Sequence, residues 1–155
     1  MDKPSFPLAV VMQWRRLRNR WVEGAWEPWG VLPGEREEAS PRLLVEGPDL
    51  AQWLYPGFRL VLHRDEAAGY HFNVTAQDPR VFVLWHEDGE RGVPLEVTAS
   101  YDEASRWLDG GHSVDGVAMP AEIYAWVGRY VEENYRPEPE KRIKPRSFQR
   151  PGRRF

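Results

Sequence analysis

Cysteine is absent from the 155 residues, and histidine occurs only four times. Without cysteine the chain has no disulfide, no thiolate zinc site, no cysteine-ligated iron–sulfur cluster and no cysteine nucleophile. The spacings of His63, His71, His86 and His112 match no motif of metal ligands. The residues therefore predict no metal site and indicate no cofactor.

Long apolar segments are also missing. No stretch approaches the roughly 20 apolar residues that a membrane-spanning helix needs. The short apolar run at residues 8–12 is followed by arginines rather than by a small-residue cleavage site, so we expect no signal peptide. Gly110 and Gly111 follow a predicted helix, whereas a phosphate-binding loop precedes one. These absences favour a cytoplasmic protein with no membrane span.

The net charge of −3 conceals a strong asymmetry. Residues 141–155 carry seven lysines and arginines and no acid, whereas residues 1–140 carry 14 basic and 24 acidic residues, a net charge of −10. Proline, lysine and arginine dominate after residue 136, and no hydrophobic periodicity remains there. We therefore predict one domain at residues 1–136 and a disordered basic tail at residues 137–155.

The order of the elements predicts an α+β fold: a curved antiparallel sheet or partly open barrel, with two C-terminal helices. Short apolar runs bounded by turn residues predict strands at residues 7–17, 25–32, 42–46, 58–64, 81–85 and 94–98. Tyr70, Phe72 and Val74 alternate with polar residues, which predicts a further half-buried strand. Residues 49–54 are assigned one helical turn.

Two helix signals follow the strands. Ser100 and Glu103 form a capping-box pattern, and the same helix carries Trp107, which we expect to anchor it to the sheet. Pro120 is expected at the first position of the last helix. A short extended segment at residues 114–118 separates the two helices.

Chemistry-bearing residues are few. His63 and Glu66 are close in sequence and could act as an acid–base pair, but no nucleophile or orienting group accompanies them. We therefore predict no catalytic residue. An unrecognised enzyme or small-ligand binder that uses the region between His63 and His71 stays open as one alternative.

The basic tail and the tryptophans are the stronger binding candidates. Flexible basic arms bind acidic proteins, nucleic acids or anionic lipids, and aromatic residues among the cations can stack on bases. Tryptophan, which occurs eight times, is enriched in cores and at interfaces. The predicted partner-binding residues are Lys141, Arg142, Lys144, Arg146, Phe148, Arg150, Trp26 and Trp29. A second basic cluster, from Arg15 to Arg20, supports nucleic-acid binding as another alternative.

The order of several motifs resembles a known family over about residues 6–148. The motifs are Trp26 and Trp29 before Val31-Leu32-Pro33-Gly34, Leu62-His63-Arg64 with Tyr70 and Asn73, the run from Val97 to Ala104, and Met119-Pro120 before Trp126-Val127. The sequence is similar to an uncharacterised bacterial domain family encoded beside molybdenum-dependent formate dehydrogenases. The resemblance implies an accessory role in the assembly or maturation of such an oxidoreductase, or a small subunit of it, with a protein partner. In that family a Phe usually precedes the Lys/Arg pairs of the tail, whereas here Phe148 follows them.

Overall fold

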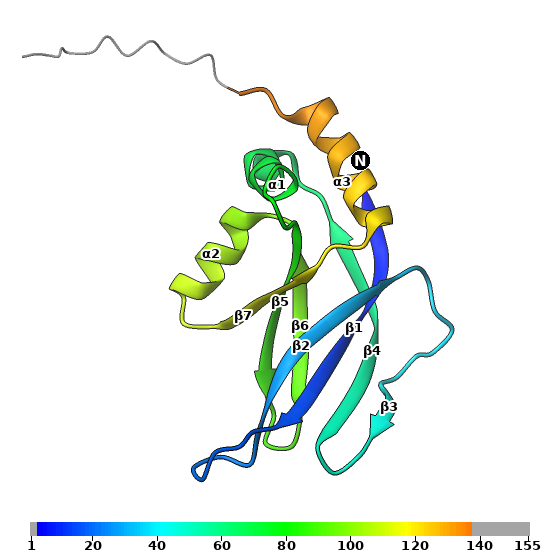
Figure 1. Ribbon diagram of the computed structural model, residues 1–155. Helices are drawn as coiled ribbons and strands as arrows, with labels where there is room; N and C mark the ends of the chain where they lie inside the picture. The colour runs from blue at the N-terminus through cyan, green and yellow to red at the C-terminus, as the bar shows by residue number, and fades with distance from the viewer. Residues whose placement is uncertain (1–2, 138–155) are drawn as a thin grey trace, which may run out of the picture.

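Two antiparallel sheets and three helices make up residues 3–137, which a computed structural model describes (Figure 1). The strands are β1 (Ser5–Arg16), β2 (Gly24–Pro33), β3 (Arg42–Glu46), β4 (Leu50–Val61), β5 (Arg80–Glu87), β6 (Gly92–Thr98) and β7 (Ser113–Ala118). The first sheet has the order β2-β1-β4-β3, and the second has the order β6-β5-β7. The predicted fold class is confirmed, whereas the predicted disorder of the tail lies outside the described residues.

The two sheets curve around one core without closing. Strand β2 lies beside β7, and β4 lies beside β6, so six strands surround the interior. Strand β3 hydrogen-bonds only to β4 and stands outside this ring at the edge of the first sheet, with all five residues exposed. The arrangement is therefore a partly open barrel with one additional edge strand.

The central strand β1 explains the single apolar run of the N-terminal region. Residues 8–12 are all buried, because β1 is paired on both sides and covered on both faces. Leu8, Val10 and Met12 face the main core, whereas Ala9 and Val11 join a smaller cluster on the other face. Burial on both faces replaces the alternation that a half-exposed strand would show.

The helices are α1 (Ala67–Val74), which follows a 3-10 turn at Arg64–Glu66, α2 (Tyr101–Asp109) and α3 (Ala121–Asn134). Helices α1 and α3 pack on each other at one end of the barrel. The β1–β2 and β5–β6 connections lie at the opposite end (Figure 1). The molecule therefore has a helical end and a hairpin end.

Two local predictions are wrong. Residues 49–54 belong mostly to β4, where pairing with β1 on one side and β3 on the other replaces the expected helical turn. Residues 70–74 form the last part of α1 rather than a strand. Tyr70 and Asn73, which are three positions apart, are buried there, whereas Phe72 is exposed. Asn73 is polar but lies on the buried face of the helix, so the sequence showed the alternation of polar and apolar residues that is typical of a strand.

Helix α2 begins as predicted. The Ser100 hydroxyl accepts a hydrogen bond from the Glu103 amide at 3.0 Å, which confirms the N-cap. The Glu103 carboxylate accepts from the Thr98 hydroxyl instead of from the Ser100 amide. Ala104 is the buried residue of this helix, whereas Trp107 is partly buried. The anchoring role expected of Trp107 stays a prediction.

Helix α3 begins one residue later than expected, because Pro120 is its N-cap rather than its first residue. Ile123, Val127 and Val131 recur at helical spacing on the buried face. They pack into the same core as the inward residues of both sheets. The last helix thus closes one end of the barrel.

The buried amide of Asn73 attaches α1 to the second sheet. Its Nδ2 donates to the carbonyls of Arg80 and Ala99 at 2.7 and 2.8 Å, and its Oδ1 accepts from the Arg80 amide at 2.9 Å. Asn73 is only 2% exposed, so water cannot replace these bonds. One side chain therefore joins the helix to the start of β5 and to the chain just after β6.

We predict that Asn73→Ala lowers the free energy of unfolding by about 3 kcal/mol or more. The substitution leaves three backbone groups unpaired, and each unpaired buried group costs about 1–3 kcal/mol. Urea unfolding followed by tryptophan fluorescence measures the change. Asn134→Ala is the matched control, since its amide makes one hydrogen bond, to the Tyr130 carbonyl. Equal stabilities of the two variants would show that the three hydrogen bonds of Asn73 do not hold α1 to the second sheet.

Candidate partner-binding surfaces

Six of the predicted partner-binding residues lie in the tail, outside the described residues. They are Lys141, Arg142, Lys144, Arg146, Phe148 and Arg150. Their role stays a prediction. The structure places the other two, Trp26 and Trp29, in very different surroundings.

The hairpin end presents the most exposed tryptophan. Residues 17–23 connect β1 and β2, and Trp21 within them is 81% exposed. The Arg20 guanidinium lies 5.7 Å from the centre of the Trp21 ring, and Val22 beside it is also exposed. Arg18 and Arg20 form no ion pair with any residue the structure describes. We name residues 17–23 the hairpin tip.

The predicted basic cluster from Arg15 to Arg20 is thus divided. Arg15 pairs with Glu27 across β1 and β2, and Arg16 pairs with Asp49 at 2.8 Å. These ion pairs are exposed, so each contributes little to stability. Only the arginines of the hairpin tip keep their charges available for another molecule.

Trp26 belongs to a cluster that supports the hairpin. It is half-buried and lines a hollow together with Trp14, Trp53 and Arg91. The Arg91 guanidinium lies only 3.8 Å from the centre of the Trp53 ring. A Cβ on Gly92 would lie 2.8 Å from the Cβ of Trp26, so only glycine allows this approach of β6. Trp26 is therefore a structural residue with a partly exposed edge.

Trp29 is exposed for a different reason. Met12 pairs with Pro28 and Val11 pairs with Gly30, so Trp29 is an extra residue in β2 at a β-bulge. The bulge directs its side chain out of the regular alternation. With 56% of its surface exposed, Trp29 stays available for contact with a partner.

His63 and Glu66 do not face each other as an acid–base pair. The His63 ring contacts the Lys3 ammonium through Nδ1 at 2.9 Å. The Glu66 carboxylate accepts hydrogen bonds from the Ser100 hydroxyl, at 2.6 Å, and from the Arg106 guanidinium. Both carboxylate oxygens are thus engaged in joining the 3-10 turn to α2. This network has a structural role, because Ser100 is completely buried and caps α2.

The neighbouring Tyr70 is also a structural group. Its hydroxyl accepts a hydrogen bond from the backbone amide of His63 at 2.8 Å. Burial raises the pKa of the Tyr70 hydroxyl above its usual value, so the group stays protonated near neutral pH. The region between His63 and His71 therefore offers no ionised tyrosine for chemistry.

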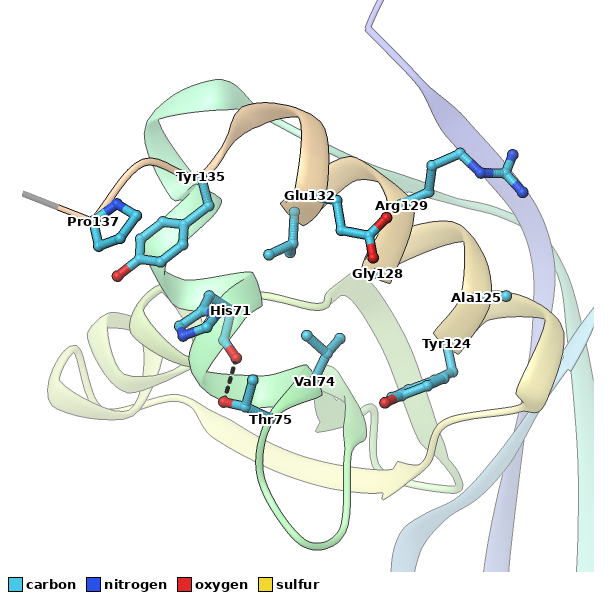
Figure 2. A pocket seen from close by; sticks show the side chains of 11 residues that line it. His71, Val74, Thr75, Tyr124, Ala125, Gly128, Arg129, Glu132, Tyr135 and Pro137 are labelled. Atoms are coloured by element: carbon cyan, nitrogen blue, oxygen red, sulfur yellow. Dashed lines mark hydrogen bonds between the residues drawn. The ribbon is translucent and has the colours of Figure 1, made fainter.

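A groove of about 730 Å³ lies at the helical end and is lined by residues of both α1 and α3 (Figure 2). His71 stacks on Tyr135 at one end, with ring centres 4.4 Å apart. Tyr124 lies at the other end, and Gly128 and Val74 lie between them. The apolar middle and polar ends are typical of a binding surface. The isolated glycine at position 128, in the middle of α3, is the sequence signal for this groove.

Metal ligands do not converge in residues 3–137, where no group of three or more His, Asp or Glu side chains could hold an ion. No helix within the same residues is long and apolar enough to cross a membrane.

The family model described as "Protein of unknown function (DUF3305)" matches residues 7–144. The chain belongs to this family. No curated protein and no solved structure matches it significantly. The resemblance identified from the motifs is thus confirmed as far as a family of unknown function, which assigns no reaction and no partner. The match includes residues 138–144, so the DUF3305 domain continues past the end of α3.

We predict that truncating Trp26 destabilises the fold and that truncating Trp29 does not. Trp26→Ala should lower the free energy of unfolding by about 2 kcal/mol or more, since truncating a buried Trp costs about 3–5 kcal/mol and Trp26 is half-buried. Trp29→Ala should change it by less than about 0.5 kcal/mol, as most surface substitutions do. Chemical denaturation of both variants checks this. A greater loss for Trp29→Ala would show that our assignment of the two side chains is reversed.

Proposed function

We propose that this DUF3305 protein is a non-catalytic accessory protein that binds a partner protein. The observation that carries the proposal is Trp21, which is 81% exposed on the hairpin tip between two arginines and a valine. Trp and Arg are the residue types most enriched among interface hot spots. An exposed Trp offers a large apolar area that a partner can bury at a low cost in side-chain entropy.

The support of the hairpin tip strengthens this proposal. The strands on either side of the tip carry Trp14 and Trp26, which pair across β1 and β2 and line the same hollow as Trp53 and Arg91. Burial of large aromatic groups fixes the base of the hairpin, so the tip extends from a rigid support. Preorganised contact residues lose less entropy on binding than residues of an unsupported loop.

Charge favours an acidic protein surface as the target. The hairpin tip carries Arg18 and Arg20, and the tail from Lys141 onward adds seven cations, while residues 1–140 have a net charge of −10. Opposite charges accelerate encounter with an acidic partner and orient it. The acidic body would repel a polyanion that approached it closely, which disfavours a nucleic acid.

The resemblance of the motifs supports a more specific partner. The motifs resemble a family that is encoded beside molybdenum-dependent formate dehydrogenases. We therefore infer that the partner is an oxidoreductase subunit or a protein of its maturation machinery. An assembly factor, a maturation factor and a small subunit all fit this inference. The engagement of Glu66 by Ser100 and Arg106 supports a binding role over an enzymatic one.

Nucleic-acid binding is the second candidate, because the Arg20 guanidinium lies beside the exposed ring of Trp21. Such a pair can stack on an unpaired base and neutralise a phosphate. The salt dependence of binding distinguishes this candidate from the first.

We predict that Trp21→Ala weakens binding to formate dehydrogenase subunits at least about tenfold, a loss of about 1.4 kcal/mol. Deletion of residues 141–155 should weaken it to a similar extent at low salt and much less at high salt, because screening reduces the contribution of exposed charges. Titration of fluorescently labelled subunits with each full-length or truncated variant measures both effects. Leu108→Ala, which alters an exposed apolar residue of α2, is the control and should bind as the unaltered protein does.

Unchanged affinity of Trp21→Ala would remove the hairpin tip from the mechanism. Tight binding to single-stranded RNA would favour the second candidate, provided that log affinity falls linearly with log salt at about −0.7 per phosphate contact.

A further inference from the structure

The floor of the α1–α3 groove contains a glycine that packing does not require. Gly128 lies in the middle of α3, where glycine costs about 1 kcal/mol relative to alanine. A Cβ at this position would meet no atom within 4 Å among the described residues. The glycine therefore leaves open a place where another chain segment can approach the helix closely.

The polar groups around this floor also lack partners within residues 3–137. The side chains of Glu132, Tyr124, Tyr135 and His71 form no hydrogen bond or ion pair there. Figure 2 shows the Glu132 carboxylate over the groove and the Arg129 guanidinium directed away from it. The groove thus combines an apolar floor with one unneutralised carboxylate and aromatic ends. This combination suits an apolar side chain next to a cation.

The chain itself continues from the end of this groove. Pro137 lines the groove beside Tyr135, and it is the last described residue. Residues 141–144 follow with the sequence Lys-Arg-Ile-Lys, in which Ile143 is the one aliphatic residue after Pro137. The DUF3305 match ends at Lys144, so this segment belongs to the family's domain, whereas residues 145–155 lie beyond it.

We propose that residues 141–144 bind in the α1–α3 groove of their own chain, with Ile143 over Gly128 and Val74 and a neighbouring cation at Glu132. The distance permits this contact. Pro137 itself lines the groove, and the six residues from there to Ile143 span up to about 20 Å when extended. Gly128 lies six positions before the last residue of α3, Asn134, about 9 Å along the helix axis. Charge and polarity are complementary, since the segment is cationic and the groove carries a carboxylate.

This docking goes beyond the proposed function and does not rest on it. The docked segment contains three of the tail's seven cations, one of which pairs with Glu132, and the remaining four, from Arg146 onward, are not part of it. A partner that binds the first three has to displace the segment from the groove. Docking in the groove then determines how many cations of the basic tail can bind a partner.

Limited proteolysis of the full-length protein with trypsin tests the proposal. We expect the bonds after Lys141 and Arg142 to be cut at least about tenfold more slowly than the bond after Arg146, which corresponds to about 1.4 kcal/mol of docking. Gly128→Leu places a side chain in the groove, where its Cβ meets no atom within 4 Å among the described residues, and it should abolish the difference. Glu133→Leu, which adds the same side chain at an exposed position outside the groove, should preserve it. The melting temperature of both variants confirms that they fold.

Equal cleavage of the three bonds in the unaltered protein would overturn the proposal. It would also be overturned if the protection survived in Gly128→Leu, since the segment would then bind elsewhere. Protection that increased with protein concentration would assign the groove to the segment of a second copy instead of to the same chain.

Discussion

The side-chain amide of Asn73 makes three buried hydrogen bonds to the backbone, and the helical end of the molecule depends on them. They fix α1 against the second sheet at the start of β5 and just after β6. Once α1 is fixed, Gly69 lies so close to Ser100 that a Cβ would fall 2.2 Å from the hydroxyl oxygen. This approach brings Glu66 to Ser100 and thereby joins α1 to the cap of α2. The same placement of α1 creates one wall of the groove opposite α3.

The hairpin end follows a different physical principle. Three tryptophan rings line one hollow beside a single cation there, with Arg91 over Trp53 and glycine at the point of closest approach to Trp26. One guanidinium nitrogen of Arg91 is buried without a hydrogen-bond partner among residues 3–137, so the aromatic face is its main compensation. The tip that extends from this support carries Trp21 into solvent. The hairpin tip and the α1–α3 groove are therefore separate candidate surfaces, since the β1–β2 connection lies at the end of the molecule opposite α1 and α3 (Figure 1).

The sequence was sufficient for the fold class, most strands and the cap of α2, because these depend on local apolar runs and turn residues. It was not sufficient for α1, since Asn73 is buried by contacts with Arg80 and Ala99 that sequence spacing does not reveal. Helix α2 buries only Ala104 completely, and its Tyr101 ring packs edge-to-face on Phe82 of β5, with ring centres 6.1 Å apart, a contact that the capping pattern does not reveal.

The sequence predicted that tryptophans form binding surfaces, but it did not predict which tryptophans are exposed. Counting tryptophans indicated binding surfaces, but burial distinguishes Trp26 from Trp29, and the exposure of Trp29 follows from a bulge in β2 between Pro28 and Gly30 that the predicted strand did not include. The nearness of His63 and Glu66 in the sequence did not reveal that Glu66 is hydrogen-bonded by a residue 34 positions later, Ser100. Gly128 was the one local signal of the groove.

We propose that this DUF3305 protein binds a protein partner through the exposed hairpin tip. Affinity capture of the tagged protein from its native cells, with quantitative mass spectrometry of the captured proteins, tests this proposal when Trp21→Ala is processed in parallel. We expect subunits of a molybdenum-dependent formate dehydrogenase, or proteins of its maturation machinery, to be enriched with the unaltered protein and depleted with Trp21→Ala. Recovery of the same proteins in equal amounts with both forms, or recovery mainly of RNA and ribosomal proteins, would rule out this role of the hairpin tip.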